Sequence, residues 1–227
     1  MLDDLTNLQA LLKDSTLLAT KGYIAGEWCD GENGQTFPVY NPARGDVITD
    51  VADISRTQTA EAISIAEKAQ KLWAARPAKE RSNLLRNWYN LMMENQEDLA
   101  TILTAEQGKP IEEAKGEIAY GASFIEFFAE EAKRVYGETI PGHQSDKRIT
   151  VLKQPVGVAA SITPWNFPNA MITRKAGPAL AAGCAFIARP AAETPLSALA
   201  MGILADRAGL PKGILSIIPS SRSSEIG

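Results

Sequence analysis

Residues 163–169, which read TPWNFPN, hold the side chains of this chain best suited to chemistry. They follow directly on the apolar run VGVAASI (156–162), which has the composition of a buried strand. Trp165 offers a large indole and Asn166 a polar amide, and a proline lies on either side of the two. A plain connecting loop needs neither side chain, whereas a reaction site can use both. This stretch is therefore the first candidate for a functional site.

The elements that position this stretch follow from the last third of the chain. Short apolar runs at 156–162, 185–189 and 214–219 predict strands, and helical patterns at about 167–183 and 195–208 lie between them. Strand and helix alternating at this spacing predict a parallel βαβαβ sheet of partial Rossmann-like type. In such sheets ligands bind beyond the carboxyl ends of the strands.

Three stretches lie at those carboxyl ends: TPWNFP, RPAAETP and PSSRSSEIG. Trp165 and Asn166 then stand at the rim where a ligand would bind. Pro168 suits the first turn of the helix expected from residue 167, whose free backbone N–H groups attract anions. Because the chain has no G-x-G-x-x-G fingerprint, composition and spacing alone indicate only half of a nucleotide-binding type of sheet.

The first 135 residues predict two other kinds of structure. Turn-rich sequence separates β-prone runs at about 23–28, 36–40 and 47–53, which favours a small antiparallel β element. From 57 to 135, apolar residues recur at spacings of three and four, the pattern of amphipathic helices. These helices form a helical layer, and their aromatic residues are assigned to its core: Trp88, Tyr89, Phe124, Phe127 and Phe128.

The segment between these parts contains YGETIPGHQSDK (136–147), a loop by composition, followed by the extended RITVLKQPVGV. His143, the only histidine, lies in that loop with no second histidine or cysteine nearby, so we expect no metal site. The predicted organisation is a β element and helical layer over 1–135, a loop with extended arms over 136–157, and the first part of the parallel sheet over 158–227.

Composition and charge exclude several classes of partner. The 227 residues carry a net charge of −4 without a block of like charges, which gives no electrostatic reason to expect nucleic acid or a membrane surface. The only cysteines, Cys29 and Cys184, lie far apart, so a disulfide framework is not expected and the reducing cytoplasm fits. No apolar run reaches the roughly 18 residues of a membrane span.

The stretch ITPWNFPNAMITRKAGPALAAG, followed by RPAAETPLSALA, resembles the aldehyde dehydrogenase superfamily. Within it, EQGKPIEEAKGEIAYGASFIEFFAEEAKRVYGETIPG and KQPVGVAASITPWNFP resemble bacterial succinate-semialdehyde dehydrogenases, and the resemblance covers essentially the whole chain from GYIAGEW onward. It implies an aldehyde dehydrogenase-like fold with a cofactor domain, a catalytic domain and a small oligomerisation hairpin. It also implies NAD(P)-dependent oxidation of succinate semialdehyde to succinate by a homo-oligomeric enzyme.

The resemblance assigns roles to single residues. In the family a cysteine thiolate attacks the aldehyde, hydride passes to the nicotinamide, and water activated by a glutamate hydrolyses the thioester. Asn166 matches the asparagine whose side-chain N–H stabilises the oxyanion, and a cap of the helix at 167 is its alternative, compatible role. Arg174 matches the arginine that binds the substrate carboxylate, with a salt bridge as the alternative. The residues expected against the cofactor are Ile162, Thr163, Pro164, Trp165, Asn166, Arg189, Pro190, Ala191 and Ala192.

The expected cofactor is NADP, with NAD as the alternative. Arg189 stands where the family usually carries a lysine that bonds the adenosine ribose, and arginine keeps the charge with a planar fork. Many NAD-using relatives carry a glutamate three residues later, where this chain has Ala192, and Glu193 is one residue too late. A missing acid beside a cation favours the dianionic 2′-phosphate of NADP.

The family's nucleophilic cysteine and general-base glutamate lie further along a longer protein, and neither Cys29 nor Cys184 sits in the family's cysteine motif. We therefore expect an N-terminal part of a dehydrogenase, shortened by truncation, proteolysis or an early stop, that is inactive alone. The alternative is a non-catalytic module that binds nucleotide or associates with intact subunits through its arms. In either case 214–219 is expected to be a raw edge of the sheet.

Overall fold

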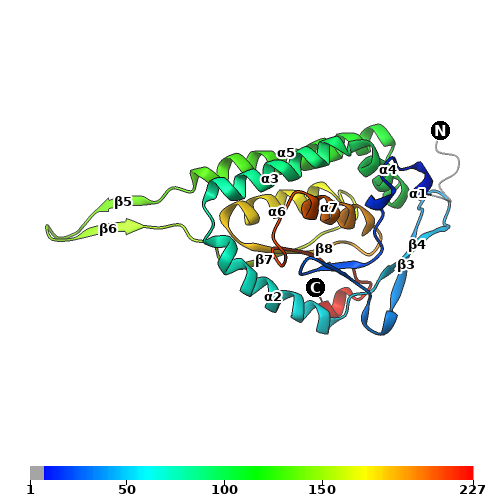
Figure 1. The fold of residues 1–227 in the computed structure, drawn as a ribbon, viewed down its shortest axis with the longest axis horizontal. Coiled ribbons are helices and arrows are strands. Elements are labelled where there is room, and N and C mark those ends of the chain that lie inside the picture. The colour runs from blue at the N-terminus through cyan, green and yellow to red at the C-terminus, as the bar shows by residue number, and fades with distance from the viewer. Residues whose placement is uncertain (1–7, 227) are drawn as a thin grey trace.

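The computed structural model describes residues 8–226. The helices are α1 (Leu8–Leu11), α2 (Arg56–Ala74), α3 (Ala78–Glu94), α4 (Gln96–Gln107), α5 (Ile111–Glu131), α6 (Ala170–Ala182), α7 (Leu196–Arg207) and α8 (Ser223–Ile226). The strands are β1 (Gly22–Ile24), β2 (Glu27–Cys29), β3 (Thr36–Tyr40), β4 (Val47–Ala52), β5 (Glu138–Pro141), β6 (Arg148–Val151), β7 (Val158–Ile162), β8 (Ala185–Arg189) and β9 (Leu215–Ile217). A central sheet lies between α2 on one face and α6 and α7 on the other, with α3, α4 and α5 outside them (Figure 1).

The last third of the chain forms the predicted βαβαβ unit. Strands β7, β8 and β9 are parallel neighbours joined through α6 and α7. At the carboxyl end Ile162 of β7 pairs with Arg189 of β8, so the stretches that follow these two strands begin side by side. Gly183, with a φ of 97°, ends α6 in the left-handed conformation that favours glycine and turns the chain into β8.

The N-terminal β element joins this sheet, whose strand order is β2-β1-β9-β8-β7. The predicted single strand at 23–28 is two strands, because Ala25 and Gly26 have φ of 56° and 80° and form a tight turn. Strand β1 pairs antiparallel with β9 through Tyr23 and Ile217. The prediction that 214–219 is a raw edge is therefore wrong, because a strand from nearly 200 residues earlier covers it.

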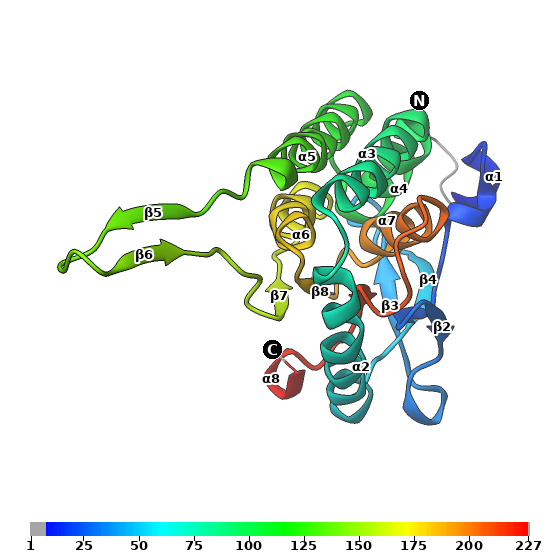
Figure 2. The ribbon, with the colours of Figure 1, turned by 60° about the vertical axis from the view of Figure 1, so that its left-hand side comes forward.

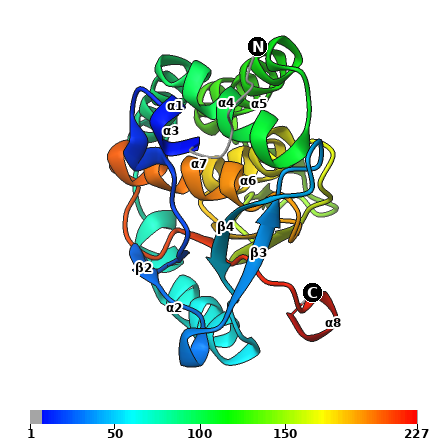
Figure 3. The same cartoon turned by 90° about the vertical axis from the view of Figure 1, so that its right-hand side faces the viewer.

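Strands β3 and β4 form a second, separate antiparallel hairpin, which crosses the front of the molecule in Figure 3. After β4 the chain enters α2 through a capping box. The side chain of Ser55 accepts the N–H of Gln58 at 3.2 Å, and the side chain of Gln58 accepts the N–H of Ser55 at 3.1 Å. Both ends of this turn are thus fixed next to Asp53, a residue of the candidate site below.

Two buried tryptophans connect α2 and α3 to the helices α6 and α7. The indole N–H of Trp73 on α2 donates to the carbonyl of Leu180 at 3.0 Å, and that of Trp88 on α3 donates to Met201 at 3.1 Å. Replacing either ring by alanine would cost about 3–5 kcal/mol of stability. The assignment of all the helix aromatics to the core is wrong for Phe127, which is 58% exposed on α5.

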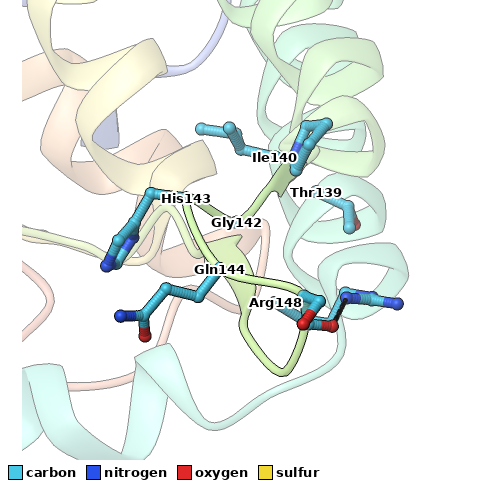
Figure 4. A pocket seen from close by; sticks show the side chains of 8 residues that line it. Thr139, Ile140, Gly142, His143, Gln144 and Arg148 are labelled. Carbon is cyan, nitrogen blue, oxygen red and sulfur yellow. Dashed lines mark hydrogen bonds between the residues drawn. The ribbon is translucent and has the colours of Figure 1, made fainter.

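A long two-stranded arm leaves the body after α5 and returns before β7 (Figure 2). Strand β5 lies within 136–147, so the prediction of a loop there is wrong for these four residues, which pair with β6. Every residue of both strands is exposed. His143 lies in the turn at the tip of the arm and, together with Arg148, lines the pocket drawn in Figure 4.

Residues 8–226 contain no group of three histidine, cysteine or acidic side chains placed to hold a metal ion. None of the helices formed by these residues is long and apolar enough to cross a membrane.

Candidate functional site

The carboxyl edge of the parallel sheet exposes an unusual amount of apolar surface. Ile162 is 57% exposed, Trp165 54% and Phe167 41%, all within six residues. Thr163, by contrast, is buried, and its N–H donates to the carbonyl of Arg189 at 3.2 Å. Apolar side chains gathered on such a rim mark a surface that binds a ligand or another part of a protein.

Asn166 lies on this rim with its side chain exposed. Helix α6 begins only at Ala170, with Asn169 at its cap position, so the alternative role of Asn166 as a cap is wrong. Pro168 lies in the turn just before the helix, where the N–H of Met171 donates to the carbonyl of Phe167 at 3.0 Å. The start of α6 is capped instead by Glu117 on α5. Its Oε1 accepts the N–H of Asn169 at 3.0 Å and that of Ala170 at 3.3 Å. These N–H groups are therefore not free to bind an anion.

The next helix of the unit begins in the same way. Glu106 of α4 accepts the N–H of Leu196 at 2.7 Å and that of Ser197 at 2.8 Å. Burial raises the pKa of Glu106 to about 8, against the lowering effect of these hydrogen bonds. Since acidic side chains already occupy the N-termini of α6 and α7, neither helix end offers the phosphate site that the fold class suggests.

Arg189 turns inward from the end of β8. It is 8% exposed, and its Nη2 donates to the carbonyl of Ser220 in the loop after β9 at 3.1 Å. Burial lowers the pKa of the guanidinium, and its Nε has no hydrogen-bond partner among the described residues. Pro190 and Ala191 are buried as well, so Ala192 is the first of this group to approach the surface.

The loop after β9 is held by Asp53, which the sequence reasoning missed. The carboxylate of Asp53 accepts the hydroxyls of Ser220 and Ser221, each at 2.7 Å, and the N–H of Ser221 at 3.1 Å. Burial acts to raise the pKa of Asp53, but these hydrogen bonds outweigh it and the pKa lies below its ordinary value. No local pattern marks this role, because Asp53 and Ser220 are 167 residues apart.

A cavity of about 390 Å³ opens beside Ala192 and Ser221. Its walls are mostly apolar and come from the β3–β4 hairpin and from the stretches after β8 and β9. The lining residues are Phe37, Pro38, Tyr40, Pro42, Glu106, Ala192, Glu193 and Ser221. The structure thus brings Ala192 together with hairpin residues that no motif singled out.

Arg174 and Lys175 lie side by side on α6 but behave differently. The guanidinium of Arg174 lies 5.7 Å from the centre of the Phe124 ring and forms no ion pair within residues 8–226. Lys175 folds back and donates to the carbonyl of Met171 at 3.0 Å, and burial lowers its pKa. The alternative of a salt bridge for Arg174 therefore finds no partner in the described chain.

Neither cysteine lies near Asn166. Cys184 is buried and comes directly before β8, at the amino edge of the parallel sheet, whereas Asn166 follows the carboxyl edge. Cys29 ends β2, which is four strand spacings, or about 19 Å, from β7. Burial also raises the pKa of the Cys29 thiol, which disfavours the nucleophilic thiolate.

Comparisons with known proteins agree with the fold. The Aldehyde dehydrogenase family matches residues 28–227, and the chain belongs to this family. It is 59% identical over 216 residues to glutarate-semialdehyde dehydrogenase of Pseudomonas aeruginosa, and the aligned region covers 95% of the chain and 44% of that protein. It is 58% identical to the NADP(+) succinate-semialdehyde dehydrogenase GabD of Escherichia coli, over 92% of the chain and 44% of that protein.

Solved structures lead to the same family. A crystal structure of an aldehyde dehydrogenase from Brucella melitensis biovar abortus 2308 superposes with a TM-score of 0.93 at 56% identity, over 95% of the chain and 44% of that structure. The succinate-semialdehyde dehydrogenase of Burkholderia pseudomallei also gives a TM-score of 0.93, at 53% identity, with the same coverage. The chain therefore spans less than half the length of these relatives.

Proposed function

We propose that the chain is the N-terminal part of an NADP-dependent dehydrogenase that oxidises a short acid semialdehyde, succinate or glutarate semialdehyde, to the dicarboxylic acid. The observation that carries the proposal is Arg174, an exposed guanidinium without an ionic partner among residues 8–226. The named relatives act on glutarate semialdehyde, succinate semialdehyde and 3-sulfolactaldehyde, each an aldehyde that carries an anionic group.

Arg174 would bind the carboxylate at the far end of the substrate. A guanidinium holds a carboxylate through two parallel hydrogen bonds, which fix both its distance and its orientation. The Phe124 ring under the guanidinium limits its freedom before the substrate arrives, so less entropy is lost on binding. Neutral aldehydes would gain nothing from this contact.

Asn166 would stabilise the oxyanion that forms when the aldehyde is attacked. Its side-chain amide is exposed on the rim of the sheet and forms no hydrogen bond with residues 8–226. A fixed N–H donor at that point stabilises charge that develops only in the transition state. The attacking cysteine and the base would come from parts of the full-length enzyme beyond these residues, since Cys29 and Cys184 lie elsewhere.

The carboxyl edge fits a dinucleotide in part. Ile162 and Trp165 offer exposed apolar surface for the nicotinamide, and the buried hydroxyls of Ser161 and Thr163 lack partners among the described residues. When bound, NADP accepts the hydride from the substrate. Ala192 carries no charge and leaves space beside the cavity for the 2′-phosphate, although Glu193 lines the same cavity.

The 227-residue chain would be inactive by itself. The full-length enzyme that contains it would be a cytoplasmic homo-oligomer. We keep the predicted organisation in three parts, with boundaries after residues 135 and 157, as part of this proposal. One observation favours the alternative role in subunit association: the β5–β6 arm exposes Ile140, Ile149 and Val151 on strands that, among the described residues, form a sheet only with each other. Such an arm is suited to pairing with another subunit.

The direct test compares a full-length enzyme containing this chain with the 227-residue chain purified to homogeneity. NADPH formation is measured with succinate semialdehyde, glutarate semialdehyde and a neutral aldehyde of similar length. We expect turnover of the two acids by the full-length enzyme alone. Steady NADPH formation by the isolated chain, or a preference of the full-length enzyme for the neutral aldehyde, would contradict the proposal.

A further inference from the structure

Lys109 and Glu117 form a nearly buried ion pair next to the candidate catalytic loop, 163–169. We propose that this pair is a positioning device that holds the backbone of Asn166 so that its amide faces the substrate. The inference rests on the proposed function, because that function gives Asn166 its catalytic role. It gives a role to two residues, on the loop before α5 and on α5 itself, to which the sequence analysis assigned none.

Glu117 connects the pair to the start of α6. Its side chain is 1% exposed, and its two oxygens serve different partners. Oε1 accepts the N–H groups of Asn169 and Ala170 at 3.0 and 3.3 Å, while Oε2 accepts from Lys109 at 2.5 Å. One carboxylate therefore fixes the end of the loop and also the ammonium group beside it.

Lys109 connects the pair to Asn166. Its ammonium donates to the backbone carbonyl of Asn166 at 3.2 Å and lies 4.0 Å from the centre of the Phe167 ring. The loop is thus fixed on both sides of Pro168, at Asn166 by Lys109 and at Asn169 by Glu117. With its backbone carbonyl held on the Lys109 side, Asn166 leaves its side chain on the exposed rim.

Helix capping alone does not explain the lysine. Glu106 caps α7 with two comparable hydrogen bonds, and it forms no ion pair with any residue of 8–226. A buried carboxyl group is therefore sufficient to begin such a helix in this fold. What Lys109 adds is its contact with Asn166 and Phe167, at the desolvation cost that a buried charge pair carries.

Close packing against α5 limits the loop further. A Cβ atom on Gly121 would lie 2.2 Å from Oδ1 of Asn169, so the loop occupies space that any larger residue would fill. The side-chain amide of Asn169 is fully buried there. The loop is therefore closely packed on its α5 side, and we expect it to shift away from α5 if the ion pair is removed. Misplacement of a catalytic group by about 1 Å can cost 10²-fold in rate.

The test uses Lys109→Met in the full-length enzyme, which keeps the length of the side chain and removes its charge. Lys109→Arg keeps a cation, and Lys115→Met is the matched control, because Lys115 pairs on the surface with Glu97 and Glu112. Two quantities are measured: amide hydrogen exchange of the peptide covering 163–171, with the start of α7 as internal reference, and kcat with KM for succinate semialdehyde.

For Lys109→Met we expect exchange in 163–171 to accelerate about tenfold or more, with the start of α7 unchanged. We also expect kcat to fall roughly 10- to 100-fold while KM changes less than about threefold. Lys109→Arg should recover most of the loss, and Lys115→Met should resemble the wild type. Unchanged exchange, or faster exchange throughout α5, α6 and α7 with no recovery by arginine, would overturn the inference.

The two readouts separate this inference from the proposed function. If exchange accelerates but neither Lys109→Met nor Asn166→Ala lowers kcat, the loop is held as described and the catalytic role of Asn166 is wrong. If Asn166→Ala lowers kcat while Lys109→Met alters neither exchange nor kcat, the catalytic role stands and the positioning device does not.

Discussion

The guanidinium of Arg189, at the end of β8, donates to the backbone carbonyl of Ser220 at 3.1 Å and so joins one parallel strand to the loop that follows the next. A cation is thereby fixed beneath the surface on which Ala192 and Ser221 line one cavity. At this end of the edge the exposed acid is Glu193, which comes one residue after Ala192. This relationship determines the first prediction, on the choice of cofactor.

In a full-length enzyme we predict a higher kcat/KM for NADP than for NAD, and we predict that Ala192→Glu reverses the order. A carboxylate at residue 192 would repel the 2′-phosphate and could accept a ribose hydroxyl, a change of about tenfold or more. Glu193→Ala removes an acid from the same cavity and should therefore shift the ratio the other way, further toward NADP. Steady-state kinetics with both cofactors measure it, and a wild type that prefers NAD would refute the prediction.

Asn166→Ala should lower kcat by about 10²-fold or more, the loss typical of one oxyanion donor. The substitution removes no side-chain hydrogen bond between residues 8–226, because the contact of Asn166 with Lys109 uses its backbone carbonyl. Thermal stability should therefore remain close to that of the wild type. A change confined to KM would show that Asn166 only positions the substrate.

Asp53 should make the stability of the chain depend on acid pH. Its pKa is lowered in the folded state, so its hydrogen bonds stabilise the fold above its ordinary pKa and are lost as the pH falls through the folded value. Asp53→Asn should therefore cost about 2 kcal/mol at neutral pH and clearly less near about pH 3. Urea unfolding at the two pH values measures this, and a cost that grows with acidity would argue against it.

The sequence was sufficient for the parts of the fold that rest on local periodicity. The strands β7, β8 and β9 and the helices between them were predicted from the spacing of apolar residues, a pattern that is complete within each short segment. The carboxyl edge with Trp165 and Asn166 then follows from the topology rule for parallel sheets. The assignment of β9 as an edge failed because its partner Tyr23 comes from a distant hairpin.

The remaining features depend on buried polar contacts between distant residues. Glu117 and Asn169 are 52 residues apart, and Glu106 and Leu196 are 90 apart. An acidic residue in an amphipathic helix looks like a solvated position in sequence, and only the packing of α4 and α5 against the inner helices shows that these two cap other helices. The converse holds for Phe127, whose apolar side chain faces outward.

The central claim, that this chain binds the acid end of a semialdehyde, is tested most directly through Arg174. In a full-length enzyme, kcat/KM is measured for succinate semialdehyde and for a neutral aldehyde of similar length, in the wild type, in Arg174→Ala and in Lys175→Ala. We predict that Arg174→Ala lowers kcat/KM for the acid by about 10²-fold, the worth of a bidentate charged contact, and mainly through KM. The neutral aldehyde should be oxidised almost as before. Equal losses on both substrates in Arg174→Ala would contradict the account, because Arg174 would then support the fold rather than recognise the carboxylate.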